Sequence, residues 1–204
     1  MIIDFEELSA GQRYFQMIQT LIPRPIAWVL SKHDNGSYNL APFSYFSAVC
    51  SDPALVMISV GRKACGEQKD TCANIEANKH FTVHIPDMQM LTVMSASGEA
   101  MPAGVSEVEM LGLETVPFGD FPLPRLKGAK VAYACELYDT HEIGHGGQSV
   151  IYGQVKAIYL DDSIIDSSVK SRVKVDAGRL NPIAWLGGDE YAGLTAVSRL
   201  SDSV

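Results

Sequence analysis

The chain has 204 residues, of which 47% are hydrophobic and 20% charged, and its formal net charge is −8 at pH 7. A chain of this length can bury about 70% of the surface that its unfolded form exposes, which predicts one folded domain over residues 1–204. The acidic balance and the scattered Lys and Arg residues argue against a nucleic-acid-binding surface, which would gather cations along one stripe.

The N-terminal sequence MIIDFEEL is acidic where a secretory signal would be basic. A charge or a proline also interrupts every apolar run before the about 20 residues that a membrane span requires. We therefore expect a cytoplasmic protein without a membrane segment. Cys50, Cys65, Cys72 and Cys135 form no C-x-x-C pair, and we expect these thiols to be reduced and buried as structural filling.

Residues 11–21 carry apolar side chains at helical spacing, which predicts a helix that ends before Pro23 and Pro25. The next two apolar, β-prone runs, 26–31 and 37–43, flank the segment HDNG. Because Asn and Gly tolerate the positive φ angles of a tight turn, this arrangement predicts a β-hairpin.

Residues 54–61 form a continuous apolar run, which predicts a strand that is either buried on both faces or lines a barrel. The following segment, 69–80, is typical of a helix with Asp70 or Thr71 as its N-cap. Residues 79–86 then alternate in the manner of the next strand.

Residues 87–97 favour a short helix whose methionines fill the core rather than bind a metal or ligand. Segment 98–128 is rich in Gly and Pro, which predicts a long irregular excursion over the surface. Two more strands are expected at 130–139 and 149–162. Because strands dominate without regular β-α alternation, we expect a mainly β fold, a small antiparallel barrel with short flanking helices.

The segment HEIGHGG, residues 141–147, contains the H-E-x-x-H pattern by which many zinc hydrolases hold their metal. The pattern requires a helix, since a helix turns the imidazoles of residues i and i+4 toward one metal. Gly144, Gly146 and Gly147 disfavour a helix here, and the flanks are typical of strands. We therefore expect a hairpin loop with two surface histidines and no metal site. A zinc site completed by a distant carboxylate is the alternative.

A second group of residues has the chemistry of a phosphate site. Segment SVGRK, residues 59–63, ends a strand with a hydroxyl, a glycine and two cations, and Lys69, Asp70 and Thr71 open the following helix. A buried phosphate monoester needs such donors, because N–H groups at a helix start and nearby cations both stabilise it. The aromatic segment 39–49 could hold a flat ring. Taken singly, each feature is equally well explained as a turn, a cap or core packing.

Six segments, in this order along the chain, resemble the flavin reductase-like family, which has an FMN-binding split barrel and includes the flavoredoxin type. They are PRPIAWV (23–29), NLAPFSYFS (39–47), DPALVMISVGR (52–62), KDT (69–71), VSEVEMLGL (105–113) and WLGGDEYA (185–192). The resemblance implies an antiparallel split β-barrel of Greek-key type. It also implies a homodimer in which each subunit holds one FMN near the subunit interface.

The resemblance further implies which residues bind the cofactor. The FMN phosphate would be held by Ser59, Arg62, Lys69 and Thr71, next to Gly61, while Asp70 would orient the helix start or the ribityl chain. The isoalloxazine would lie largely against backbone groups of Asn39, Ala41, Pro42, Phe43, Ser44 and Tyr45. At the phosphate, these implied roles agree with the donors found from the residues alone.

The implied activity is that of an FMN-dependent NAD(P)H:flavin oxidoreductase. NADH or NADPH would donate a hydride to the flavin, which passes electrons to another flavin, a partner monooxygenase, a redox protein or oxygen. The flavin supplies the reactivity, so no catalytic side chain is assigned. Gln148 stands where nicotinamide-dependent members commonly carry a histidine, and Trp185 where the family often has an arginine. An FMN-binding electron carrier, reduced by a partner protein without NAD(P)H, is therefore the alternative.

Overall fold

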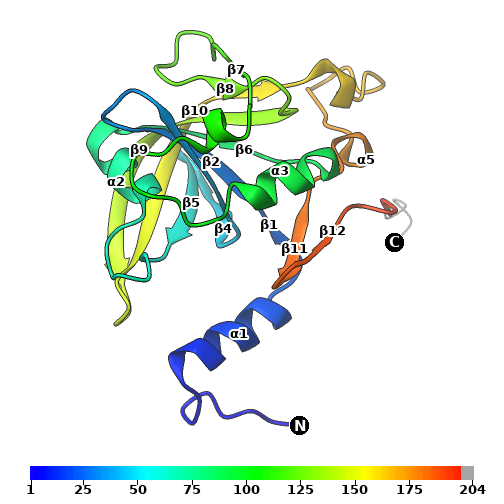
Figure 1. Cartoon of the computed structure of the whole chain (residues 1–204). Helices are drawn as coiled ribbons and strands as arrows, with labels where there is room; N and C mark the ends of the chain where they lie inside the picture. The colour runs from blue at the N-terminus through cyan, green and yellow to red at the C-terminus, as the bar shows by residue number, and fades with distance from the viewer. Residues whose placement is uncertain (199–204) are drawn as a thin grey trace.

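The computed structural model describes residues 1–198, and its main feature is a seven-stranded antiparallel sheet (Figure 1). Across the sheet the strands are β3 (Tyr38–Phe43), β2 (Ala27–Lys32), β6 (His80–His84), β9 (Val131–Ile143), β10 (Gln148–Leu160), β5 (Ala54–Val60) and β4 (Phe46–Ser51). The edge strands β3 and β4 are separated along the chain only by Ser44 and Tyr45. The sheet must therefore curl until its edges meet, which confirms the mainly β, antiparallel split barrel.

Short helices and two small sheets surround the barrel. The helices are α1 (Ala10–Thr20), α2 (Asp70–Asn78), α3 (Leu91–Ala96), α4 (Glu107–Met110) and α5 (Ala177–Leu180), with 3-10 turns at Met88–Met90 and Asp162–Ile164. One small sheet joins β1 (Arg24–Pro25), β11 (Ala184–Gly187) and β12 (Glu190–Ala192), and the other joins β7 (Thr115–Val116) and β8 (Arg125–Leu126). Helix α1 projects away from the barrel (Figure 1). Within residues 1–198, no helix has the length and apolar character to cross a membrane.

Local chemistry explains where several elements begin and end. Ser9 and Gln12 form a reciprocal capping box at the start of α1, which satisfies backbone N–H groups that have no partner within the helix. The hairpin between β2 and β3 turns through Gly36, whose φ of +89° is the conformation that favours glycine. The Asn-Gly turn and both of its strands were predicted from the sequence, and the structure confirms them.

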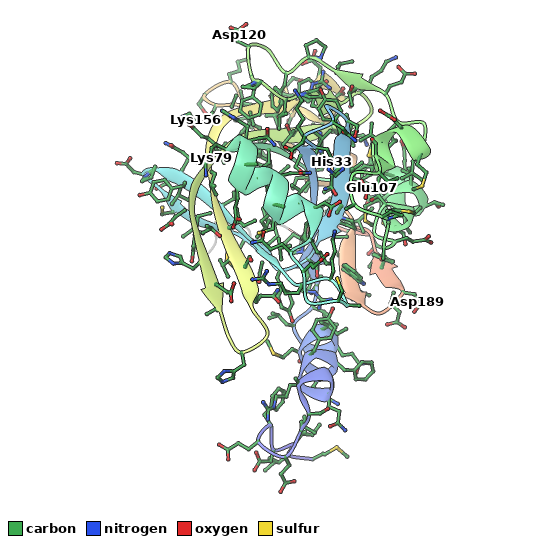
Figure 2. The ribbon with its side chains drawn as sticks, turned by 60° about the vertical axis from the view of Figure 1, so that its left-hand side comes forward. His33, Lys79, Glu107, Asp120, Lys156 and Asp189 are labelled. Atoms are coloured by element: carbon green, nitrogen blue, oxygen red, sulfur yellow. The ribbon has the colours of Figure 1, made fainter. Side chains whose placement is uncertain are left out.

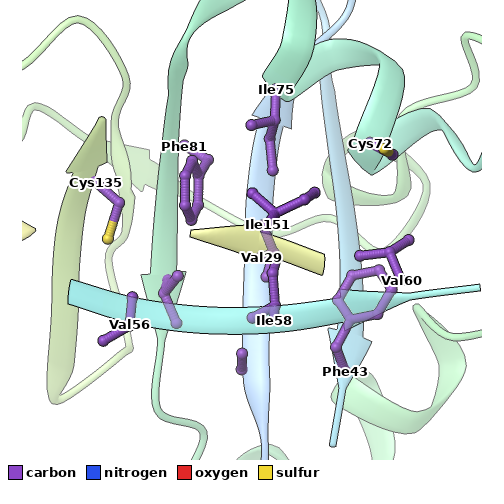
Figure 3. Packing of buried hydrophobic residues seen from close by; sticks show 12 residues of the cluster. Val29, Phe43, Val56, Ile58, Val60, Cys72, Ile75, Phe81, Cys135 and Ile151 are labelled. Atoms are coloured by element: carbon purple, nitrogen blue, oxygen red, sulfur yellow. The ribbon is translucent and has the colours of Figure 1, made fainter. Parts of the chain in front are cut away.

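The interior of the barrel is apolar and tightly packed (Figure 3). Val56, Ile58 and Val60 of β5 point into it, while Met57 and Ser59 on the opposite face remain partly exposed. Strand β5 therefore lines the barrel and is not buried on both faces. Gly153 of β10 lies so close to Phe81 that a Cβ atom there would be 2.3 Å from the ring, so only glycine fits.

A second core lies outside the barrel and buries the other face of β2. Trp28 and Leu30 pack there with Met94 of α3, and the indole Nε1 of Trp28 donates to Ser97 Oγ at 2.8 Å. Met88 and Met90 pack against the same cluster. The methionines of segment 87–97 thus fill the core, as predicted.

Helix α2 differs from its prediction at the N-terminus. Its N-cap is Lys69, and neither Asp70 nor Thr71 caps the helix with a side chain. The physical reason is that both side chains are engaged elsewhere, since Asp70 pairs with Lys63 and Thr71 accepts a hydrogen bond from Asn39. The helix ends at Asn78, within the predicted segment 69–80.

Two further expectations require correction. Cys72 and Cys135 are buried, but Cys50 and Cys65 are exposed, because Cys50 lies on the edge strand β4 and Cys65 in the turn after β5. Segment 98–128 is not wholly irregular, since it contains α4 and the β7–β8 pair. Ser106 caps α4 by accepting from the Glu109 N–H, a local contact that allows a helix within a Gly- and Pro-rich segment.

Candidate functional site

Two cavities meet beside the start of α2, and Lys69 lines both. The cation cavity, about 350 Å³, is lined by Asn39, Ala41, Arg62, Lys63, Ala64, Lys69, Asp70, Thr71, Glu107 and the segment 97–101. The aromatic cavity, about 300 Å³, is lined by Tyr14, Pro42, Phe43, Ser44, Tyr45, Ser59, Gly61, Lys69, Gln148 and Trp185. All twelve residues predicted to bind a cofactor lie in one of these walls.

The strand connections explain why these residues converge. The link between β3 and β4 passes over the end of β5, where the Ser59 N–H donates to the Tyr45 carbonyl at 2.9 Å. This hydrogen bond connects two predicted parts of the site. Tyr45 belongs to the segment predicted to face a ring, and Ser59 to the segment predicted to bind phosphate. Asn39 Nδ2 of β3 donates to Thr71 Oγ1 of α2 at 2.9 Å, which closes the other side of the site.

The cations of the site have unequal partners. Lys63 is paired with the Asp70 carboxylate, and this hydrogen bond raises the pKa of Lys63. Burial acts to raise the pKa of Asp70, but hydrogen bonds from Lys63 and the Gly104 N–H outweigh it and lower that pKa.

Lys69 forms no ion pair within residues 1–198, and its Nζ lies 5.8 Å from the centre of the Phe43 ring. Lys69 as a residue is exposed, yet partial burial of its ammonium group lowers the pKa of that group. A partly desolvated cation without a protein anion is suited to an anionic ligand.

Arg62 is fixed by the hairpin between β9 and β10. Its Nε donates to the Gly147 carbonyl at 2.8 Å, and its Nη2 pairs with the Glu142 carboxylate. Gly147 has a φ of +64°, and a Cβ atom there would lie 3.0 Å from Arg62 Nε. A glycine at this position therefore allows the backbone to approach the guanidinium.

The same hairpin contains HEIGHGG. Residues 141–143 end β9 and the glycines form the turn, so the segment is not a helix, as predicted. His141 and His145 are both exposed, and His141 lies 3.2 Å from the Asp139 carboxylate. Among residues 1–198, no cluster of three His, Cys, Asp or Glu side chains is arranged to hold a metal ion.

The structure adds Glu107 to the site, which the sequence placed in a recognised segment without a role. Glu107 is only 6% exposed, and its Oε2 accepts from the Leu40 N–H at 2.9 Å. Burial raises the pKa of this carboxyl. Figure 2 shows Glu107 beside His33, close to α2. No local pattern could have found this residue, because Leu40 is 67 positions away in the sequence.

The two positions that depart from the family pattern also line the aromatic cavity. Gln148 Nε2 donates to Ser59 Oγ at 2.9 Å, so this side chain is fixed against one of the predicted phosphate ligands. Trp185 stacks on Tyr191 with ring centres 5.5 Å apart, and both pack against the second core. Trp185 therefore combines core packing with a place in the cavity wall.

The residues present fit a ligand that joins an anion to a flat ring. Lys69 and Arg62 supply charge in the cation cavity, and the start of α2 supplies backbone N–H groups. Phe43, Tyr45 and Trp185 supply flat apolar walls in the aromatic cavity.

Comparisons with known proteins agree with this chemistry. The sequence model of the flavin reductase like domain matches residues 19–175. The uncharacterized protein BH2278 of Halalkalibacterium halodurans is 33% identical over 195 residues, which cover 94% of this chain and 91% of that protein. The uncharacterized protein YwrF of Bacillus subtilis is 33% identical over 198 residues, which cover 95% of this chain and 94% of that protein.

Solved structures have the same fold over nearly the whole chain. Nitrilotriacetate monooxygenase component B from Bacillus cereus superposes with a TM-score of 0.90 at 29% identity, covering 98% of both chains. The 2-nitrobenzoate 2-nitroreductase NbaA of Pseudomonas fluorescens gives 0.88 at 29% identity, covering 98% of this chain and 95% of that one. Flavoredoxin of Desulfovibrio vulgaris superposes with a TM-score of 0.75 at 19% identity, covering 100% of this chain and 98% of that one. Together with the matched domain, these relatives show that the chain belongs to the flavin reductase-like family.

Proposed function

We propose that the protein binds FMN and acts as an NAD(P)H:flavin oxidoreductase. The observation that carries the proposal is Lys69, a partly buried ammonium that lines both cavities and has no anionic partner within residues 1–198. A phosphate there would stabilise the charged ammonium, and a ring joined to that phosphate would reach the aromatic cavity.

The proposed phosphate and ring sites each take residues from both cavity walls. Ser59, Arg62, Lys69 and Thr71 bind the phosphate, with Gly61 leaving room beside it, and Asp70 fixes Lys63 at the start of α2. The backbone from Asn39 to Tyr45 supports the ring. When bound, FMN supplies the redox chemistry, since its ring accepts a hydride from NADH or NADPH and passes the electrons on. The chain contributes binding, orientation and the exclusion of water.

The name of one relative supports a proposal for the protein that accepts the electrons. Component B of nitrilotriacetate monooxygenase is 29% identical to this chain, and its name makes it one component of a monooxygenase. We propose that this protein likewise delivers reducing equivalents to a partner monooxygenase or redox protein. We also propose a cytoplasmic location, where exposed thiols such as those of Cys50 and Cys65 stay reduced.

The proposal includes a homodimer. Helix α1 projects from the barrel (Figure 1) and leaves Tyr14, Phe15, Met17 and Leu21 exposed, although Ile18 is buried. A second copy would remove this apolar face from water. Tyr14 also lines the aromatic cavity, so the interface would lie beside the site. Sedimentation velocity tests this, with an expected mass of twice the 22.2 kDa of the chain.

Gln148 favours a second candidate function, an FMN-binding electron carrier reduced by a partner protein. Its amide is fixed by Ser59 and cannot titrate near neutral pH, unlike the histidine commonly found at this position. The carrier would bind FMN at the same site but would not react directly with a pyridine nucleotide.

One spectroscopic experiment separates the two functions. The purified protein is loaded with FMN, and its absorbance is recorded without oxygen before and after NADH, then NADPH, is added. Prompt bleaching of the flavin bands supports the oxidoreductase and names the donor. Bleaching by dithionite alone supports the carrier. Failure to take up FMN would contradict both.

A further inference from the structure

One buried carboxylate in the cation cavity has an oxygen without a hydrogen-bond donor from another residue. Glu107 is 6% exposed, and its Oε2 accepts from the Leu40 N–H, but within residues 1–198 no donor from any other residue reaches its Oε1. Every fully buried side-chain oxygen in that part of the chain has a partner. Oε1 is therefore not fully buried, and the cavity that Glu107 lines is the space open to it.

The partly buried carboxylate of Asp70, in the same wall, already has partners for both of its oxygens. Asp70 Oδ1 pairs with Lys63 and Oδ2 accepts from the Gly104 N–H at 3.2 Å. Glu99 lines the same cavity but is exposed to solvent, so Glu107 is the buried carboxylate left to meet a ligand. A carboxylate repels a phosphate, so the phosphate belongs near Arg62 and Lys69, and Glu107 is suited to a neutral donor such as a hydroxyl group.

We infer that Glu107 accepts hydrogen bonds from the hydroxyl groups of a ligand's polyol chain, which in FMN is the ribityl chain. The inference rests on the proposed function and extends it to the part of the ligand between phosphate and ring. The raised pKa of Glu107, caused by burial, is consistent with this role, because a hydroxyl donor replaces water that the buried carboxylate lacks.

The test compares three ligands that share a ring. FMN and riboflavin carry the ribityl chain, whereas lumiflavin has a methyl group in its place. Glu107→Gln keeps an oxygen for the Leu40 N–H but removes the charge. We expect this variant to bind FMN and riboflavin about tenfold more weakly, as loss of a charge-assisted hydrogen bond predicts, and lumiflavin unchanged. The matched control is Glu109→Gln, an exposed position on the same short helix, which should leave all three affinities unchanged.

Flavin fluorescence quenching measures the nine dissociation constants. Equal FMN affinity in the wild type and Glu107→Gln would overturn the role of Glu107 alone. An equal loss for all three ligands would also overturn it, because it would mean that the substitution distorts the site. If the wild type binds none of the three, the flavin proposal fails and this inference fails with it.

Discussion

The carboxylate of Glu142 pairs with the guanidinium of Arg62, although the two residues are 80 positions apart in the sequence. In a zinc hydrolase the glutamate of H-E-x-x-H activates water, but here the hairpin uses it to hold a cation of the candidate site. Gly147, from the same hairpin, accepts a second hydrogen bond from Arg62. The segment that resembles a metal motif therefore supports a cation of the candidate site.

Arg62→Ala should weaken FMN binding by about 1.5 to 3 kcal/mol, because it removes a charge-assisted contact to the phosphate. Riboflavin, which lacks the phosphate, should bind the variant as well as it binds the wild type. Isothermal titration with both ligands measures the difference. Unchanged FMN affinity would show that Arg62 does not contact the phosphate.

Glu142→Gln should have the opposite effect on FMN. Glutamine retains an oxygen that holds Arg62, but it removes a negative charge close to the phosphate. Because the Glu142 side chain is 62% exposed, we expect a gain of about two- to fivefold in FMN affinity, the scale of an exposed ion pair. Riboflavin affinity is the internal control. A loss of FMN affinity would mean that the full charge of Glu142 is needed to position Arg62.

Lys69→Met should weaken FMN binding and stabilise the ligand-free protein at the same time. Burial lowers the pKa of Lys69 in the folded state, so between that value and 10.5 the unfolded chain binds more protons. The stability of the wild type should therefore rise with pH in this window, and the variant should lose that rise. Urea unfolding without ligand and FMN titration measure the two effects. A less stable ligand-free variant would contradict this account.

The buried His84 should make the stability of the barrel sensitive to acid. Burial lowers its pKa from 6.5 to about 4, and its ring accepts from the Leu126 N–H while contacting the Trp28 carbonyl at 3.0 Å. Since only the unfolded chain binds the proton between those values, stability should fall by about 3 kcal/mol as pH drops through this window. His84→Gln, which does not titrate, should show a flatter profile in urea unfolding. Parallel profiles for the two proteins would assign the acid sensitivity to other groups.

Gly153→Ala should destabilise the barrel by about 1 to 3 kcal/mol, because the new methyl group would overlap the Phe81 ring inside a packed core. Gly146→Ala is the control, since a Cβ atom there meets nothing within 4 Å. Thermal unfolding of both variants measures the effect. Equal midpoints would mean that Phe81 can move aside without cost.

The sequence predicted those parts of the fold that local chemistry determines. The Asn-Gly turn specified the first hairpin, and apolar side chains at helical spacing located α1. A continuous apolar run located β5, and capping residues located α2 although the cap itself is Lys69. It did not predict β4, whose exposed, small residues carry little strand signal and which exists because it pairs with β5. Strand β9 likewise runs to Ile143, beyond its predicted end at 139, because β10 continues to pair with it.

The candidate site was predicted where it follows from contiguous segments and missed where it depends on distant contacts. The twelve expected residues converge on the two cavities, and their binding of FMN stays a prediction. Glu107 was missed because its place depends on the packing of α4 against β3, which no spacing along the chain reveals. The sequence did not predict that Tyr14 lines the aromatic cavity, because helical periodicity shows which side chains are apolar but not what they contact.

The two-residue link between β3 and β4 has a consequence for how the molecule opens. Ser44 and Tyr45 form the seam where the barrel's edges meet, and they also line the aromatic cavity. A motion that parts these edges would also displace two residues of the cavity wall. A ring bound in this cavity would contact the link that joins both edges, so the ligand would stabilise the closed barrel as well as fill the cavity.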